Sequence, residues 1–112
     1  MPSYISLNLN KDFLRLYHRG RSCAKPSLVV YAMKNRTGLC RVGITTSKKI
    51  GNAVQRNRAR RVIRASLQEV LRTHNLVGWD FVFVARSKTT RVKSGVVLSA
   101  MEDALRAMEV IA

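Results

Sequence analysis

Residues 46–64 read TSKKIGNAVQRNRARRVIR, and the hydrophobic pattern changes its period across this stretch. The apolar run that leads into it, residues 39–46, is typical of a buried strand. Asn52 followed by Gln55 is a capping-box pattern, which predicts a helix that begins there and continues to about His74. Within that helix the apolar residues recur at helical spacing, at Ala59, Val62, Ile63, Leu67 and Val70. The stretch therefore predicts a strand that passes through a basic loop into a long helix.

The chain on either side supplies the remaining elements. A first helix is predicted at residues 11–19, with Asn10 as its N-cap and Gly20 as its C-terminal stop. Further strands are predicted at residues 28–33 and 80–85, with a weaker one at 22–25. Residues 35–38 have the composition of a hairpin turn, so strands 28–33 and 39–46 are expected to be joined by it.

A final helix is predicted to carry Leu98, Met101, Leu105 and Met108 on one face. The order is then α-β-β-β-α-β-α, which predicts an α+β fold, a two-layer sandwich of helices against a three- or four-stranded sheet. With 112 residues, one domain spanning 1–112 is expected, and a two-domain enzyme with a large cofactor crevice is excluded.

Charge points to a polyanionic partner. The chain has 21 Lys and Arg against 6 Asp and Glu, a net charge of +15. No acid lies between Asp12 and Glu69, whereas 14 basic residues do, so the positive field belongs to the first two-thirds of the chain. Arginine outnumbers lysine by 14 to 7, which favours forked recognition of phosphates and stacking on bases. Nucleic acid is favoured over a membrane.

The long helix concentrates this charge. Placing residues 100° apart puts Asn57, Arg60, Arg61 and Arg64 on one side, flanked by Arg56 and Arg58. Such side chains lie about 5 to 6 Å apart, close to the spacing of phosphates along a strand, and no nearby acid compensates them. Lys48, Lys49 and Gly51 precede the helix N-terminus and could seat a phosphate, although the P-loop spacing is absent. The alternative is an ordinary solvated face.

These residues resemble a known family. The stretch at 46–64, with Arg56-Asn57-Arg58 at its centre, is similar to the signature of bacterial ribonuclease P protein subunits. The resemblance extends to Asp12-Phe13, Tyr17 and Gly20, to Tyr31, to Arg41-Val42-Gly43 and to residues 80–86. It implies a ribosomal-protein-like domain with a left-handed βαβ crossover through the long helix, where the general rule predicts a right-handed one.

The resemblance also implies a function. Members bind a large catalytic RNA and the 5′ leader of precursor tRNA, and the holoenzyme removes that leader to leave a mature 5′ end. Catalysis and Mg²⁺ belong to the RNA, so no catalytic or metal-ligating residue is expected in the protein. The matching positions for the leader are Phe13, Tyr17 and Tyr31; those for the catalytic RNA are Lys48, Lys49, Asn52, Arg56, Asn57, Arg58, Arg60, Arg61 and Arg64.

The chemistry of these side chains is compatible with both sets of positions, those for the leader and those for the catalytic RNA. Aromatic rings stack on unpaired bases with little sequence preference, although Phe13 could equally be a core residue. Tyr17 stands where phenylalanine is common in the family, which preserves stacking and adds a hydrogen-bonding hydroxyl. Alternatives from other classes are a ribosomal or assembly-type structural RNA-binding protein and a small DNA-binding protein, which composition cannot separate from the first interpretation.

Other classes of site are not supported. His18 and His74 stand alone, and the carboxylates do not cluster as a metal nuclease requires. Cys23 and Cys40 lack zinc spacing and are expected to be free thiols in a reducing compartment. The sequence has no signal-peptide pattern and no apolar run of about 18 residues. A cytoplasmic protein without a membrane partner or small-molecule substrate is expected.

Overall fold

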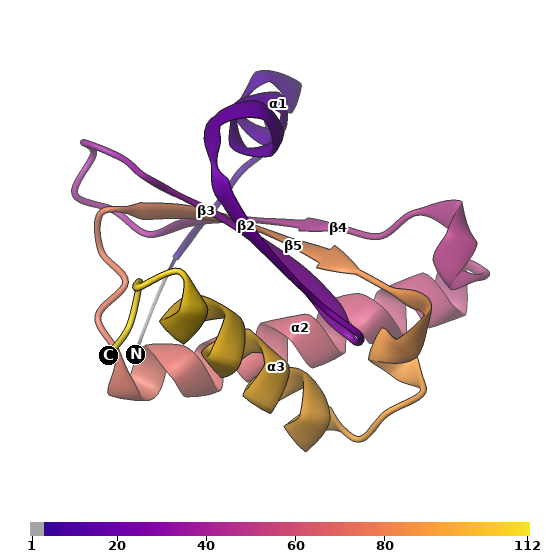
Figure 1. Ribbon diagram of the computed structural model, residues 1–112. Helices are drawn as coiled ribbons and strands as arrows, with labels where there is room; N and C mark the ends of the chain where they lie inside the picture. The colour runs from indigo at the N-terminus through magenta and orange to yellow at the C-terminus, as the bar shows by residue number, and fades with distance from the viewer. Residues whose placement is uncertain (1–3) are drawn as a thin grey trace.

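The computed structural model describes residues 4–112, which form one five-stranded mixed sheet and three helices (Figure 1). Two short 3₁₀ turns, Lys48–Ile50 and Ser87–Thr90, lie between these elements. In chain order the strands and helices are β1 (Ile5–Ser6), α1 (Asn10–Arg19), β2 (Arg21–Lys25), β3 (Leu28–Lys34), β4 (Arg41–Thr45), α2 (Ala53–Thr73), β5 (Trp79–Ala85) and α3 (Ser94–Ala107).

The sheet has the order β1-β4-β5-β3-β2. Its central strand, β5, runs antiparallel to β3 and parallel to β4. The register places Val82 of β5 between Tyr31 of β3 and Gly43 of β4. The weakly predicted second strand is present, and the two-residue edge strand β1 is an addition that the sequence pattern did not indicate.

The predicted hairpin between β3 and β4 is wrong. The turn at residues 35–38 does form, because the Asn35 side-chain carbonyl accepts from the backbone N–H of Thr37 at 3.0 Å, and Gly38 has a φ of +71°. The two strands nevertheless diverge after it, and β5 lies between them. Phe81, Val82 and Phe83 of β5 are completely buried, so this apolar strand takes the central position and pairs on both edges.

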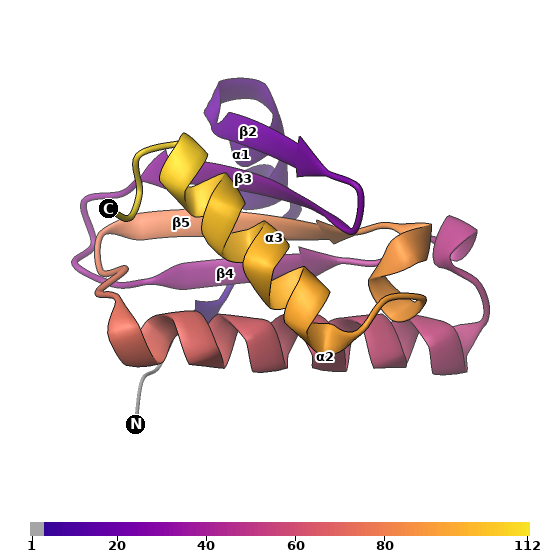
Figure 2. The same ribbon diagram turned by 60° about the horizontal axis from the view of Figure 1, so that its bottom comes forward.

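Helix α2 connects the parallel strands β4 and β5 by a left-handed crossover. In Figure 2 β4 and β5 run in the same direction with β5 above β4, and α2, at the bottom of the view, runs back the opposite way on the face of the sheet turned toward the viewer. About 98% of such connections are right-handed, so the expectation from the general rule is wrong for this chain. The expectation from the family resemblance is confirmed.

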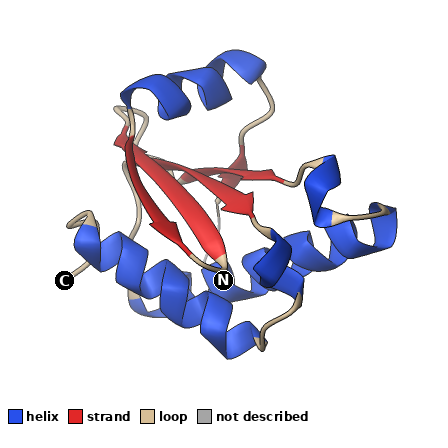
Figure 3. Cartoon of the chain, turned by 45° about the vertical axis from the view of Figure 1, so that its right-hand side comes forward, coloured by secondary structure: helices blue, strands red, loops and turns tan. Residues whose placement is uncertain are grey.

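The helices divide between the two faces of the sheet, with α2 and α3 on one and α1 on the other (Figures 1 and 3). The larger core lies under α2 and α3, where Ile63 and Leu67 of α2 and Met101 and Leu105 of α3 are fully buried. A smaller core lies under α1, where Leu16 packs with Leu7 and Val82. The α+β fold is confirmed, and α1 adds a partial third layer to the two that the sequence predicts, because it covers only part of the opposite face.

Helix ends agree with the sequence except at one position. Asn52 and Gln55 form the predicted capping box, each side-chain oxygen accepting from the other's backbone N–H at 3.0 Å. Gly20 ends α1, its N–H donating to Leu16. Asn10 is not the N-cap, however, because Leu9 holds that position without a side-chain cap bond. The first turn instead contains an ion pair within the helix, since Asp12 is buried and pairs with Arg15 three residues further on.

Candidate nucleic-acid interface

Phe13 of α1 lies directly against the sheet at Gly43. A Cβ added to Gly43 would lie 2.5 Å from two carbons of the Phe13 ring, which is closer than non-bonded carbon atoms approach each other in proteins. Glycine is therefore what lets α1 sit so near to β4. Phe13 is half-buried and packs against the small core under α1, so it contributes to that core and still leaves part of its surface accessible.

Tyr17, one turn further along α1, meets Tyr31 of β3. Their ring centroids are 4.9 Å apart and the rings are nearly perpendicular, at 75°. The Tyr17 hydroxyl also forms a 3.0 Å hydrogen bond with Oγ1 of Thr45 on β4. Tyr17 is 37% exposed and Tyr31 half-buried, so part of this aromatic pair faces solvent. We call Phe13, Tyr17 and Tyr31 the aromatic cleft.

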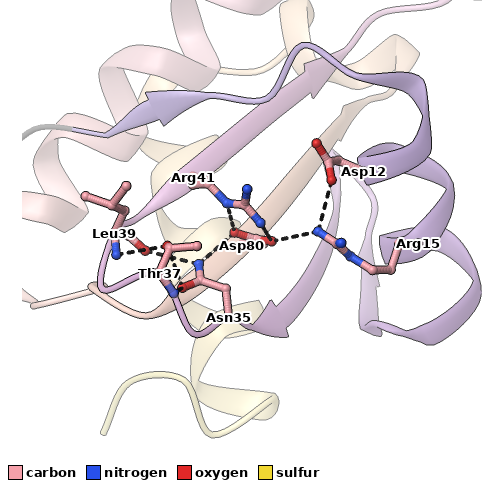
Figure 4. Close-up of polar contacts among 7 residues, drawn as sticks. All are labelled: Asp12, Arg15, Asn35, Thr37, Leu39, Arg41 and Asp80. Atoms are coloured by element: carbon pink, nitrogen blue, oxygen red, sulfur yellow. Dashed lines mark hydrogen bonds and ion pairs between the residues drawn. The ribbon is translucent and has the colours of Figure 1, made fainter.

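A buried carboxylate holds α1 in this position (Figure 4). Asp80 of β5 is 1% exposed, and its two oxygens accept from Nε and Nη2 of Arg41 at 2.8 and 2.7 Å. It also accepts from Asn35 at 2.7 Å and from Arg15 of α1 at 3.4 Å. Arg15 in turn pairs with Asp12 at 3.0 Å. The network thus joins β4, β5, the turn after β3 and α1.

This network changes how the positive charge is distributed. Arg15 and Arg41 belong to the basic stretch of the sequence, but Asp12 and Asp80 neutralise them inside the fold. The hydrogen bonds that Arg41 donates to Asp80 raise the pKa of Arg41 above its ordinary value, despite the opposing effect of burial. The sequence did not predict this network. The one signal of it in the sequence is an acid, Asp80, at the start of a buried apolar strand, because a buried carboxylate needs a partner.

The arginine side of α2 faces away from the core. Ala59, Ile63 and Leu67 are fully buried, as the helical wheel predicts, and Val62 is half-buried. On the outward side a shallow groove is lined by Val54, Asn57, Arg60, Arg61 and Arg64. Within residues 4–112, none of the basic side chains from Lys48 to Arg64 forms an ion pair. We call Asn57, Arg60, Arg61 and Arg64 the arginine face.

The loop before α2 is built around its capping box. Gly51 has a φ of +134°, and a Cβ there would lie 1.6 Å from Oε1 of Gln55, so a side chain at this position is incompatible with the box. Arg56 is half-buried and donates to the Gly51 carbonyl at 2.8 Å. Lys48 and Lys49 lie exposed on the 3₁₀ turn. Asn52 and Arg56 thus shape the loop, while Arg58 and the two lysines extend into solvent.

The aromatic cleft and the arginine face adjoin. A small hollow beside β1 is lined by Phe13 and Gly43 on one side and by Arg60 and Arg64 on the other. These arginines belong to α2, which lies on the opposite face of the sheet from α1, and the edge strand β1 beside the hollow is only two residues long. A strand of nucleic acid could therefore stack its bases in the cleft and continue along the helix with its phosphates against guanidinium groups.

Other chemistry has little support in the described part of the chain. Residues 4–112 contain no group of three or more His, Cys, Asp or Glu side chains placed to hold a metal ion. No helix among them combines the length and apolarity needed to cross a membrane. Burial, with a smaller contribution from Asp80, raises the pKa of the Cys40 thiol to about 11, which leaves it protonated and unreactive.

The fold and these surfaces define a class: a small, basic α+β protein with an exposed surface suited to unpaired nucleic acid. Comparison with known proteins gives the family. The model of the family described as Ribonuclease P matches residues 1–109. The ribonuclease P protein component of Clostridium botulinum is 41% identical over 80 residues, 71% of this chain and 72% of that protein.

Two further comparisons agree. The ribonuclease P protein component of Pelotomaculum thermopropionicum is 38% identical over 104 residues, 93% of this chain and 92% of that protein. The solved structure of the Staphylococcus aureus RNase P protein superposes with a TM-score of 0.80 at 31% identity, covering 98% of this chain and all of that one. This chain belongs to the ribonuclease P protein family.

Proposed function

We propose that this chain, the protein subunit of a ribonuclease P, divides its two RNA partners between two adjoining surfaces. The arginine face, together with Lys48, Lys49, Asn52, Arg56 and Arg58, binds the catalytic RNA. The aromatic cleft binds the single-stranded 5′ leader of precursor tRNA. The observation that carries this proposal is the hollow that Phe13, Arg60 and Arg64 line together, because it contains residues of both surfaces.

Each surface contributes a different kind of binding free energy. Stacking of a base on an aromatic side chain is worth about 1 to 3 kcal/mol and tolerates any sequence, as a leader that differs between tRNAs requires. The arginine face releases counterions from phosphates, so its contribution falls steeply with salt. Neither surface acts on the scissile phosphodiester; both hold the substrate against the RNA that does.

In this proposal the hydrolysis belongs to the catalytic RNA, which holds the Mg²⁺ ions. Mg²⁺ bound by that RNA would supply an activated water and charge stabilisation at the leaving oxygen, and hydrolysis would leave a 5′-phosphate on the tRNA. The protein residues bind and orient the leader and reduce the electrostatic repulsion between the two RNAs. The free thiols Cys23 and Cys40 support a reducing, cytoplasmic setting.

Reconstitution tests the proposal. Adding the chain to its cognate catalytic RNA at low Mg²⁺ is expected to restore cleavage of precursor tRNA at the mature 5′ end. A structural protein of the ribosome would give no stimulation at any Mg²⁺ concentration, and that result would refute the proposal.

Charge reversal tests the arginine face. Arg60→Glu with Arg64→Glu is expected to weaken binding to the catalytic RNA and to flatten its dependence on salt, because fewer counterions are released. Arg72→Glu with Arg106→Glu is the matched control: it makes the same change in net charge at arginines that form surface ion pairs elsewhere. Equal effects from both pairs would show that only total charge matters.

A further inference from the structure

A second hollow lies at the other end of the sheet from the Lys48–Ile50 turn. It is lined by Arg19, Arg21, Met33, Lys34 and Trp79, together with one acid, Glu109. Lys34 ends β3 and Trp79 begins β5, and the two are opposite each other in the register. The aromatic cleft is further along the strands, because Tyr17 reaches Thr45 at the far end of β4.

The indole of Trp79 is held by the core. It stacks on Phe81 with ring centroids 6.3 Å apart, and Phe81 stacks on Phe83 at 5.8 Å. Both phenylalanines are fully buried, whereas Trp79 is only half-buried. Three aromatic rings thus extend along β5 from the core to the surface, and the last one is a preformed platform that loses little conformational freedom when a ligand stacks on it.

Cations surround this platform. The ammonium of Lys34 lies 5.6 Å from the centroid of the Trp79 ring. Arg21 donates to the carbonyl of Met108 at 3.1 Å, which holds its guanidinium in place, and Arg19 is exposed at the last turn of α1. Glu109 is the acid among the lining residues. Within residues 4–112 it forms no ion pair with any of the three cations, and the local charge is +2.

We propose that this hollow is a second RNA-contact site, in which an unpaired base stacks on Trp79 and the flanking phosphates bind Arg19, Arg21 and Lys34. An acidic peptide would satisfy the cations but would leave the indole without a matching surface, whereas a nucleotide supplies both a flat base and a phosphate. A base-paired helix cannot offer its bases for stacking, so the ligand is a single-stranded segment or loop.

The position of Lys34 suggests how the site exchanges partners. In the free protein its ammonium rests near the indole, a favourable cation–π position. When a base stacks on the ring, the same ammonium is within reach of the adjoining phosphate, which is a stronger partner. The inference rests on the proposed function in that the ligand is RNA, but the surface is separate from the cleft and from the arginine face.

Trp79 is the only tryptophan of the chain, so its fluorescence reports this site alone. Titration with a single-stranded oligouridylate is expected to quench it to saturation. The same ribose-phosphate chain without bases is expected to bind, as measured by anisotropy of a label on the oligomer, with little quenching. Equal quenching by the abasic chain would overturn the stacking, and oligouridylate binding without quenching would overturn the site. Equal quenching by polyglutamate would assign the hollow to acidic polypeptides instead of RNA.

Variants separate this site from general charge. Arg19→Glu with Lys34→Glu is expected to raise the Kd measured by quenching about tenfold, while Arg72→Glu with Arg106→Glu, of equal charge change, has a smaller effect. Tyr17→Ala is expected to leave the quenching unchanged. Equal losses in both charge pairs would refute the proposal. A chain that stimulates the catalytic RNA but shows no quenching refutes this inference alone, whereas a chain that is quenched but never stimulates refutes the proposed function.

Discussion

Replacing Asp80 by asparagine tests whether the buried carboxylate positions α1. The substitution keeps the shape of the side chain but exchanges one acceptor oxygen for an N–H₂ donor. Arg41 donates to both oxygens, at 2.8 and 2.7 Å, and Asn35 and Arg15 donate to them as well. In Asp80→Asn one of these oxygens is lost, so that at least one guanidinium N–H of Arg41 or Arg15 faces another donor.

The magnitude follows from burial. Removing one partner of a fully buried ion pair costs about 3 to 5 kcal/mol. The Asp80 side chain is 2% exposed, but those of Arg41 and Arg15 are 23% and 37% exposed, so water compensates part of the loss. We therefore expect the free energy of unfolding to fall by about 2 to 3 kcal/mol. For a chain of this size that corresponds to a decrease in Tm of roughly 8 to 12 °C.

Urea unfolding measures the loss directly. Asp103→Asn is the matched control, because Asp103 is 61% exposed and forms an ion pair with Arg106 at 3.7 Å; such surface pairs contribute about 0 to 1 kcal/mol. Affinity for precursor tRNA is expected to fall further than affinity for mature tRNA, since α1 carries two of the three residues of the aromatic cleft. A loss below about 0.5 kcal/mol for Asp80→Asn, equal to the control, would refute this reasoning.

Three further predictions concern single contacts. Gly43→Ala is expected to destabilise the fold by about 1 to 3 kcal/mol by displacing the ring of Phe13, and Phe13→Leu in the same chain to relieve part of that cost in a urea-unfolding cycle; full additivity would show that the two residues do not meet. Because the pKa of Cys40 is raised to about 11, its thiolate fraction at pH 8 is about 100-fold below that of an ordinary thiol, so iodoacetamide should modify it rapidly only after denaturation in urea. Rapid alkylation of Cys40 in the native chain would contradict its burial. Tyr17→Phe removes the hydrogen bond to Thr45 but keeps the ring, so it should change precursor tRNA affinity less than about threefold, whereas Tyr17→Ala should weaken precursor binding about 5-fold or more; equal losses from both would assign the affinity to the hydroxyl.

The sequence by itself determined the local structure of this protein. The capping box at Asn52 and Gln55 and the stop at Gly20 were predictable because each rests on hydrogen bonds between near neighbours. The buried side of α2 was predictable because helical periodicity alone sets which residues share a face. The roles of the aromatic and arginine residues toward RNA stay predictions, although the structure places their surfaces side by side.

Tertiary structure decided everything that depends on partners distant in the sequence. Composition indicated a turn at residues 35–38, but the insertion of β5 between β3 and β4 depends on which strand best buries both faces. The charge count assigned Arg15 and Arg41 to the positive surface that faces RNA. In the fold both pair with Asp80, which lies 65 residues after Arg15 and 39 residues after Arg41. Periodicity is a property of one segment, whereas pairing, handedness and charge compensation are properties of the packed chain, and only the fold could assign them.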